Sequence, residues 1–214
     1  MRQSLLILAV LAGATPALAD DHPLIRPSRD VAVEYRSTGG PQAPAMEPGK
    51  VVTMRFASKT GRIRIEGANG RGYAILDIDS GRMTMVMVEQ HMYIEQPADP
   101  GMTAMFQARN TAFTKTGTDT VAGVSCTTYE ASINDRKGEV CLTGDGVLLR
   151  ARSGEPDRHR ELEAVKVTYG DQPDYMFEAP TGFQKMDPTA MRRGLNLSPG
   201  AAPRGEAPGG QLGR

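Results

Sequence analysis

Short runs of alternating apolar and polar residues, separated by glycine-containing turns, constrain the fold of this chain more than any other feature. The first of these runs are VAVEY (31–35), VTMRFA (52–57) and RIRIE (62–66). The connections that follow them include SKTG (58–61), GANGRG (67–72) and DSG (79–81). Successive side chains of a β-strand point to opposite faces of a sheet, so each run predicts a strand with one buried face. The glycine and small polar residues between the runs predict tight turns.

The second half of the chain repeats this pattern. Its β-prone runs are TGTDTVAGVSCTTYEAS (116–132), GEVCLT (138–143), VLLRARS (147–153) and ELEAVKVTYG (161–170). Strands joined by short turns pair with their neighbours in antiparallel fashion. We therefore predict a mainly β fold of the α+β class, in which one curved antiparallel sheet in meander order carries one main helix.

The stretch RMTMVMVEQHMYIE (82–95) allows two interpretations. Methionine and histidine are ligands that suit copper. Alternating methionines are also typical of one apolar face of a strand, where their flexible side chains line a core or a promiscuous pocket. A two-residue turn at Glu89–Gln90 pairs Met87 with Met92 and places His91 on the opposite face. This register favours the apolar interpretation, whereas a turn of odd length keeps a copper site open.

One helix is predicted near residues 99–112. Asp99 is a suitable N-cap, and Pro100 suits the first helical position. The apolar positions with helical spacing include Met102, Met105 and Phe106. We expect about three helical turns whose apolar stripe packs on the methionine face of the sheet.

The strands and this helix together predict an apolar cavity. A turn at Ser80–Gly81 pairs Ile78 with Met83, so the strands on both sides of the turn share one apolar face. The expected cavity lining is Met54, Phe56, Ile63, Ile65, Leu76, Ile78, Met83, Met85, Met87, Ile94, Met102, Met105 and Phe106. An ordinary filled core is the alternative, and it accounts for the same residues. The use of methionine in place of branched aliphatic residues, and a short helix that could act as a movable plug, favour a partly open cavity.

The chain begins with a predicted secretory signal peptide, residues 1–19. An early Arg2 precedes an apolar run at 5–12, and Ala17-Leu18-Ala19 is an A-x-A cleavage signal. The apolar run is too short to span a bilayer. We expect cleavage after Ala19 and export to the periplasm, with no lipid anchor because no cysteine follows the small residues.

Three segments follow the signal peptide. We predict an N-terminal extension at 20–29, the curved β-sheet domain at 30–186 and a disordered tail at 187–214. The tail is rich in glycine, proline and alanine and cannot bury enough apolar surface to offset the entropy of ordering. The net charge of +0 favours neither nucleic acid nor an anionic membrane as a partner.

The chain has two cysteines, Cys126 and Cys141. An even number of cysteines in an exported protein predicts one disulfide. A pair of thiols that binds a metal is the alternative, but no C-x-x-C spacing supports it. We therefore assign no metal and no cofactor.

Three passages resemble a known family. They are the TG…VAGVSC…Y pattern of residues 116–129, CLTGDGV (141–147) and FEAPTGF (177–183). In this order they resemble bacterial periplasmic proteins of a domain of unknown function related to the LolA/LolB lipoprotein carriers, over roughly residues 30–186. The resemblance implies an incomplete β-barrel whose concave apolar face is plugged by helix, and in the carriers that concavity shields lipoprotein acyl chains. No residue here matches a carrier's working positions.

Catalytic motifs are not found. The chain has three histidines and no G-x-S-x-G, H-E-x-x-H or P-loop pattern. We therefore expect a non-enzymatic periplasmic binding or carrier module whose apolar concavity accepts acyl chains of a lipid or lipoprotein. Two alternatives stay open: a copper-binding protein that uses methionines, and an envelope sensor or scaffold domain that binds a protein partner.

Overall fold

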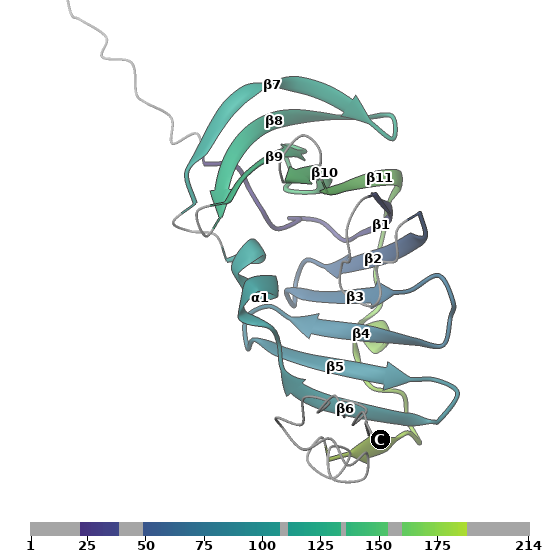
Figure 1. Cartoon of the computed structure of the whole chain (residues 1–214). Helices are drawn as coiled ribbons and strands as arrows, with labels where there is room; N and C mark the ends of the chain where they lie inside the picture. Colours follow the sequence, from purple (N-terminus) through teal and green to yellow (C-terminus); the bar gives the residue numbers. More distant parts are fainter. Residues whose placement is uncertain (1–21, 39–48, 108–110, 134–135, 154–159, 188–214) are drawn as a thin grey trace, which may run out of the picture.

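Twelve strands form one open sheet with a short α-helix on one side, as the computed structural model in Figure 1 shows. The structure describes residues 22–38, 49–107, 111–133, 136–153 and 160–187. The predicted signal peptide, and the predicted tail beyond residue 187, lie outside these residues. The first six strands are β1 (Val31–Thr38), β2 (Val51–Ala57), β3 (Arg62–Glu66), β4 (Gly72–Asp77), β5 (Arg82–Met87) and β6 (Met92–Pro97). After helix α1 (Pro100–Phe106) come β7 (Phe113–Val121), β8 (Val124–Ile133), β9 (Arg136–Leu142), β10 (Leu148–Ser153), β11 (Arg160–Tyr169), the 3-10 helix η2 (Asp174–Phe177) and β12 (Gln184–Met186). Among the described residues, no helix has the length and apolar character of a membrane span.

The strand order β12-β6-β5-β4-β3-β2-β1-β11-β10-β9-β8-β7 contains two meanders that meet where β1 pairs with β11. The pairings are antiparallel except for that of β12 with β6, which is parallel. This exception arises because the chain crosses the back of the sheet through η2 before it reaches β6 (Figure 1). The end strands β7 and β12 do not pair with each other, so the described sheet is not closed. The predicted fold class, a curved antiparallel sheet with one main helix, is confirmed.

The face of the sheet that carries α1, which we call the helix face, holds the main core. The register sets Val33 opposite Met54, and Met54 opposite Ile65, so their side chains share this face. Phe106 of α1 packs edge-on against Phe56, with ring centroids 6.3 Å apart. The most buried side chains of this core include Val31, Val33, Tyr35, Val52, Met54, Phe56, Ile63, Leu76 and Ile78.

Helix α1 begins where the sequence predicts but ends before residue 112. The Asp99 carboxylate caps it, since Oδ1 accepts a hydrogen bond from the backbone N of Gly101 at 2.7 Å. The helix ends at Phe106, whose carbonyl oxygen accepts a hydrogen bond from Arg26 Nε at 3.1 Å. The predicted three turns are therefore about two. Residues 108–110 lie outside the described part of the chain.

The N-terminal segment, residues 22–30, lies against α1 and against the turn between β9 and β10. The Arg29 guanidinium pairs with the Asp145 carboxylate of that turn at 2.7 Å. At Gly146, an added Cβ would lie 2.2 Å from the carbonyl oxygen of Arg26, so a glycine is required for this close approach. The segment and the turn are therefore packed backbone against backbone.

Asp30 fixes the start of β1. Its carboxylate accepts hydrogen bonds from the backbone N and hydroxyl of Ser58, at 2.8 and 2.7 Å, and from the backbone N of Gln172 at 3.0 Å. Partial burial opposes the charge, but these hydrogen bonds outweigh it and lower the pKa of Asp30. The carboxylate thus ties β1 to the β2–β3 turn and to the segment that leads to η2.

The reverse face of the sheet has its own small core. Phe177 of η2 is 3% exposed and packs against Ala57 and Ile75. The guanidinium of Arg64 lies 3.5 Å from the ring centroid of Tyr73, a cation–π contact. The same guanidinium donates a hydrogen bond from Nη1 to the carbonyl oxygen of Met176 at 2.9 Å, and this bond and the packing of Phe177 hold the segment that crosses the sheet towards β12.

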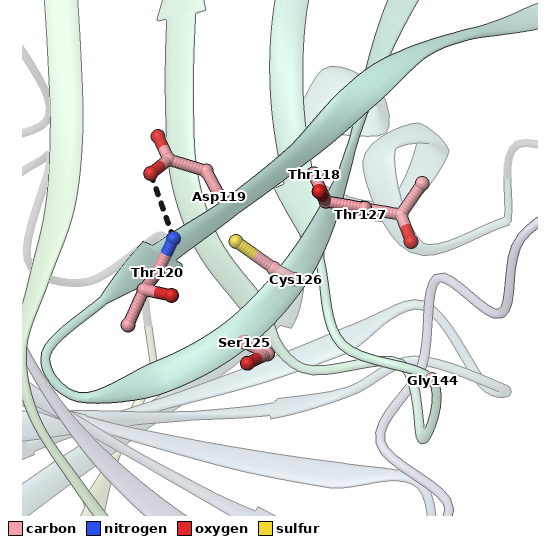
Figure 2. A pocket seen from close by; sticks show the side chains of 7 residues that line it. All are labelled: Thr118, Asp119, Thr120, Ser125, Cys126, Thr127 and Gly144. Atoms are coloured by element: carbon pink, nitrogen blue, oxygen red, sulfur yellow. Dashed lines mark hydrogen bonds between the residues drawn. The ribbon is translucent and has the colours of Figure 1, made fainter.

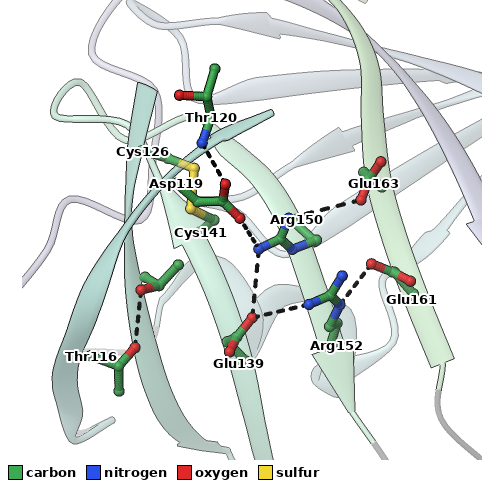
Figure 3. Close-up of polar contacts among 11 residues, drawn as sticks. Thr116, Asp119, Thr120, Cys126, Glu139, Cys141, Arg150, Arg152, Glu161 and Glu163 are labelled. Atoms are coloured by element: carbon green, nitrogen blue, oxygen red, sulfur yellow. Dashed lines mark hydrogen bonds and ion pairs between the residues drawn. A yellow bond between two sulfur atoms is a disulfide. The ribbon is translucent and has the colours of Figure 1, made fainter. Parts of the chain in front are cut away.

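Cys126 of β8 and Cys141 of β9 form the predicted disulfide, with Cα atoms 5.5 Å apart. Beside it lies Arg150, which is 9% exposed and whose guanidinium faces three carboxylates (Figure 3). These are Asp119 at 2.5 Å, Glu139 at 3.8 Å and Glu163 at 4.0 Å. Burial opposes the charge of Arg150, but the hydrogen bond to Asp119 and the charges around it raise its pKa. The disulfide and this cluster connect β7 to β11 on the reverse face.

Candidate ligand-binding groove

A groove of about 570 Å³ lies on the helix face, between α1 and strands β7–β10. Its lining is Ile25, Gly101, Phe106, Phe113, Ala131, Lys137, Gly138, Val140, Leu142, Leu148, Ala151, Arg152 and Ser153. Most of these side chains are apolar. Small-molecule sites in proteins have volumes of about 300–1,000 Å³ and mostly apolar walls, so the groove has the size and lining of such a site.

The groove exists because the side chains on its floor are small. The register sets Ala131 opposite Gly138, and Gly138 opposite Ser153. In the next row along the strands, Val140 lies opposite Ala151. Between β1 and β4 the same face carries large side chains that meet and fill the interior. Small residues on three adjacent strands therefore leave a volume that no described neighbouring side chain occupies.

The two ends of the groove differ. At one end Leu148 pairs with Leu142, and the Tyr35 hydroxyl donates a hydrogen bond to the carbonyl oxygen of Leu148 at 2.7 Å. Tyr35 is 1% exposed, and this burial raises the pKa of its hydroxyl, which therefore stays protonated and able to donate. At the other end, Lys137 and Ser153 are exposed. One end is thus anchored in the core, and the other faces solvent.

The residues predicted to line a cavity lie mostly in the core beneath α1. Those buried in this core are Met54, Phe56, Ile63, Leu76 and Ile78, and those packed against it are Ile65, Met83, Met102 and Phe106. Among the predicted residues whose side chains the structure describes, only Phe106 also lines the groove. The side chain of Met105 lies outside what the structure describes. A ligand-binding role for the predicted set stays a prediction.

The remaining predicted residues lie farther from α1, on β5 and β6. Ile94 is buried, whereas Met85 is 43% exposed. Met85 and Met87 line a shallow depression of about 440 Å³ on the helix face, together with Ile65 and residues of the neighbouring turns. The structure therefore separates the exposed end of the methionine face from the groove, with α1 between them.

The register predicted for β5 is correct where this strand pairs with β6 and wrong where it pairs with β4. Met87 pairs with Met92, as predicted. Met83, however, pairs with Leu76 rather than with Ile78. The connection between β4 and β5 has four residues, 78–81, rather than two. Because the register shifts by two, the methionines keep the predicted face.

His91 belongs to the turn between β5 and β6 rather than to a strand. Its φ is 53°, in the left-handed region, and its ring packs against Phe183 with centroids 5.1 Å apart. Its carbonyl oxygen accepts a hydrogen bond from the backbone N of Gln184 at 2.8 Å. In the described part of the chain, no three or more His, Cys, Asp or Glu side chains are grouped to hold a metal ion.

A second depression, of about 600 Å³, lies over the β7–β8 hairpin (Figure 2). Its lining is Thr118, Asp119, Thr120, Ser125, Cys126, Thr127 and Gly144. Except for Cys126, whose sulfur is bound in the disulfide, these residues are polar or lack a side chain, and most of them are exposed. Such a surface gains little by leaving water. The groove, with its apolar walls, is therefore the stronger candidate site.

Fold and groove together define an open, curved β-sheet with an apolar groove under a short helix. Residues 45–149, from the approach to β2 as far as β10, match the model of a family described as a domain of unknown function, DUF4412. No curated protein matches the chain at a significant level.

Three solved structures are similar in fold, at low sequence identity. An uncharacterized conserved protein from Thermus thermophilus is 9% identical with a TM-score of 0.49, over 74% of this chain and 90% of that chain. The Mycobacterium tuberculosis lipoprotein LppX is 14% identical with a TM-score of 0.41, over 67% of this chain and 88% of that chain. The Pseudomonas aeruginosa MucA/MucB complex is matched with 14% identity and a TM-score of 0.43, over 69% of this chain and 54% of that chain. Since all three TM-scores lie below 0.5, the functional argument rests on the groove.

Proposed function

We propose that this protein is an exported, non-enzymatic binding or carrier module whose groove holds an acyl chain of a lipid or lipoprotein. One observation carries the proposal: an apolar groove of about 570 Å³ left open beside a core that is otherwise filled. An apolar volume of this kind gains free energy when hydrocarbon enters it from water.

The size of this gain fits a carrier. Burial of each methylene group contributes about 0.8 kcal/mol, so about ten methylenes would contribute about 8 kcal/mol before the cost of association is subtracted. Association costs at least about 4 kcal/mol, so the remaining free energy corresponds to millimolar or weaker binding for a chain of this length. A carrier must release its ligand, and binding of this strength is reversible.

Sequence features support export and the carrier class. The signal peptide at 1–19 predicts the periplasm as the site of action, and the disulfide suits an oxidising compartment. The passages at 116–129, 141–147 and 177–183 resemble relatives of the LolA/LolB carriers. The polar residues of the described groove lining are Lys137, Arg152 and Ser153, and they form no recognisable catalytic arrangement, so we propose binding without catalysis.

The experiment is displacement of a hydrophobic fluorescent dye from the purified mature protein by a monoacylglycerol, together with native mass spectrometry for co-purified lipid. Ala151→Phe fills the groove floor and should abolish dye binding. Ala32→Phe is the matched control, because Ala32 lies on β1 with its side chain on the reverse face. It should leave dye binding unchanged. A wild-type protein that carries no lipid and binds no dye would refute the proposal.

A protein partner is the second candidate. The exposed depression lined by Met85 and Met87 favours it, because flexible methionine surfaces adapt to different apolar partners. Crosslinking from Val88→Cys, an exposed position beside this depression, would capture such a partner in an envelope preparation. The control is crosslinking with the same reagent from Ser153→Cys, a position beside the groove.

A further inference from the structure

We propose that the groove fixes the direction of its ligand and limits the length of its chain. The chain would enter with its methyl end towards Leu142 and Leu148, and its polar head would stay outside near Ser153. This inference rests on the proposed function, since it concerns the same groove. The expected ligand class is a single-chain amphiphile whose polar head remains in solvent.

The order of residues along β9 and β10 carries the argument. From the core outwards, the paired rows of the floor are Leu142 with Leu148, Val140 with Ala151, and Gly138 with Ser153. The side chains therefore change from large and apolar to small, and then to polar. A methyl end is best buried in the first row, where it displaces no hydrogen-bonded water. A polar head buried there would lose its hydrogen bonds to water without replacement.

The inner end is closed by the turn that follows Leu142. Thr143 and Val147 of this turn are 6% and 0% exposed. The backbone of the N-terminal segment presses on Gly146, as the short distance from an added Cβ to the Arg26 carbonyl oxygen shows. The hydrogen bond from Tyr35 holds Leu148 itself in place. A chain that reaches this wall cannot extend farther without moving the turn.

Among the described residues, the outer end of the groove is open to solvent. Ser153 and Lys137 are exposed, and Lys137 lies on the reverse face because it alternates with Gly138 along β9. Arg152 also lies on the reverse face, where it pairs with Glu161 at 2.7 Å and with Glu139 at 3.6 Å. A polar or anionic head group at this end thus stays in water.

The closed wall leads to a measurable limit. For a series of saturated fatty acids from decanoate to octadecanoate, affinity should rise by about fourfold per methylene until the chain reaches Leu148. Beyond that length it should stay level or fall. Leu148→Ala should move the limit to longer chains, by about as many carbons as the substitution removes. Leu148→Phe should move it to shorter chains and provides a second test if the alanine variant does not fold.

Leu149→Ala is the matched control. Leu149 neighbours Leu148 on β10 and is 0% exposed, but it does not line the groove. This variant should lose stability without moving the limit. Direction is tested with two fatty acids that carry a nitroxide near the carboxylate or near the methyl end. Ascorbate should reduce the first label faster than the second when both are bound.

The outcomes separate the two proposals. If no acid of any length displaces the dye, the proposed function fails, and this inference fails with it. If acids bind but affinity rises throughout the series, only the length limit is overturned. The same conclusion follows if Leu148→Ala and Leu149→Ala move the limit equally. Equal reduction of both labels would overturn the fixed direction.

Discussion

Removal of the disulfide tests the account of how the groove floor is held. Cys126 and Cys141 are 15 residues apart in sequence. A crosslink that closes a loop of about 15 residues lowers the entropy of the unfolded chain by an amount equivalent to about 3 kcal/mol at 25 °C. For a domain of about 150–250 residues, each kcal/mol shifts Tm by about 2–4 °C. The double variant Cys126→Ala/Cys141→Ala should therefore melt about 6–12 °C below the wild type.

Alanine is the suitable replacement, because both cysteines are buried and a serine hydroxyl would lack a hydrogen-bond partner there. Thermal unfolding followed by circular dichroism measures the shift. The reduced wild type is the control and should melt close to the variant. In urea the variant should also show a larger m value, since its unfolded chain is less compact. A fall in Tm of less than about 2 °C would refute the reasoning, because the crosslink would then add almost nothing to the paired strands around it.

Three further predictions concern the core, one turn and one carboxylate. Leu76→Ala should lower the free energy of unfolding by about 2–5 kcal/mol, because the Leu76 side chain is 0% exposed. Met85→Ala should lower it by less than about 1 kcal/mol, because Met85 is 43% exposed. Urea denaturation measures both values. Gly146→Ala should cost more stability than Gly49→Ala in the same assay. Both glycines have positive φ, 87° and 80°, but only at Gly146 would the new Cβ meet a carbonyl oxygen, so equal losses would contradict the close packing. Asp30→Asn should destabilise the protein near neutral pH. The pKa of Asp30 is lowered below 3.8 in the fold, so its contribution is present above that value and disappears as the pH falls through the folded pKa. Unfolding measured from about pH 7 downwards should show a loss that is constant above the unfolded pKa and shrinks as the pH falls through the folded pKa.

The strands could be predicted because their signal is local. Alternation in segments such as 31–35 and 62–66 specifies both the strand and its buried side, whatever the rest of the chain does. The disulfide could be predicted from the number of cysteines and the expected compartment. β12 could not. Its three residues, QKM, show no period, and its parallel pairing depends on the path of the chain across the reverse face.

The end of α1 shows why long-range contacts limit such predictions. The apolar spacing that begins at Met102 continues past Phe106, and local rules extend the helix to residue 112. The structure ends it at Phe106, where Arg26, from 80 residues earlier in the sequence, takes the carbonyl oxygen. No local pattern contains that contact. The shift in the β4–β5 register has a different cause, because turns of two and four residues give the same alternation on both strands.

The position of the groove could not be predicted for a related reason. Alternation shows which side chains share a face, but the free volume depends on the sizes of side chains that face one another on neighbouring strands. In β10 even the alternation misleads. Leu148 and Ala151 are three residues apart, so a regular strand would point them to opposite faces. A bulge between Leu148 and Arg150 sets Leu148 opposite Leu142 and Ala151 opposite Val140, and so returns both to the helix face. The groove floor therefore depends on one extra residue, Leu149, whose effect appears only when β10 is paired with β9.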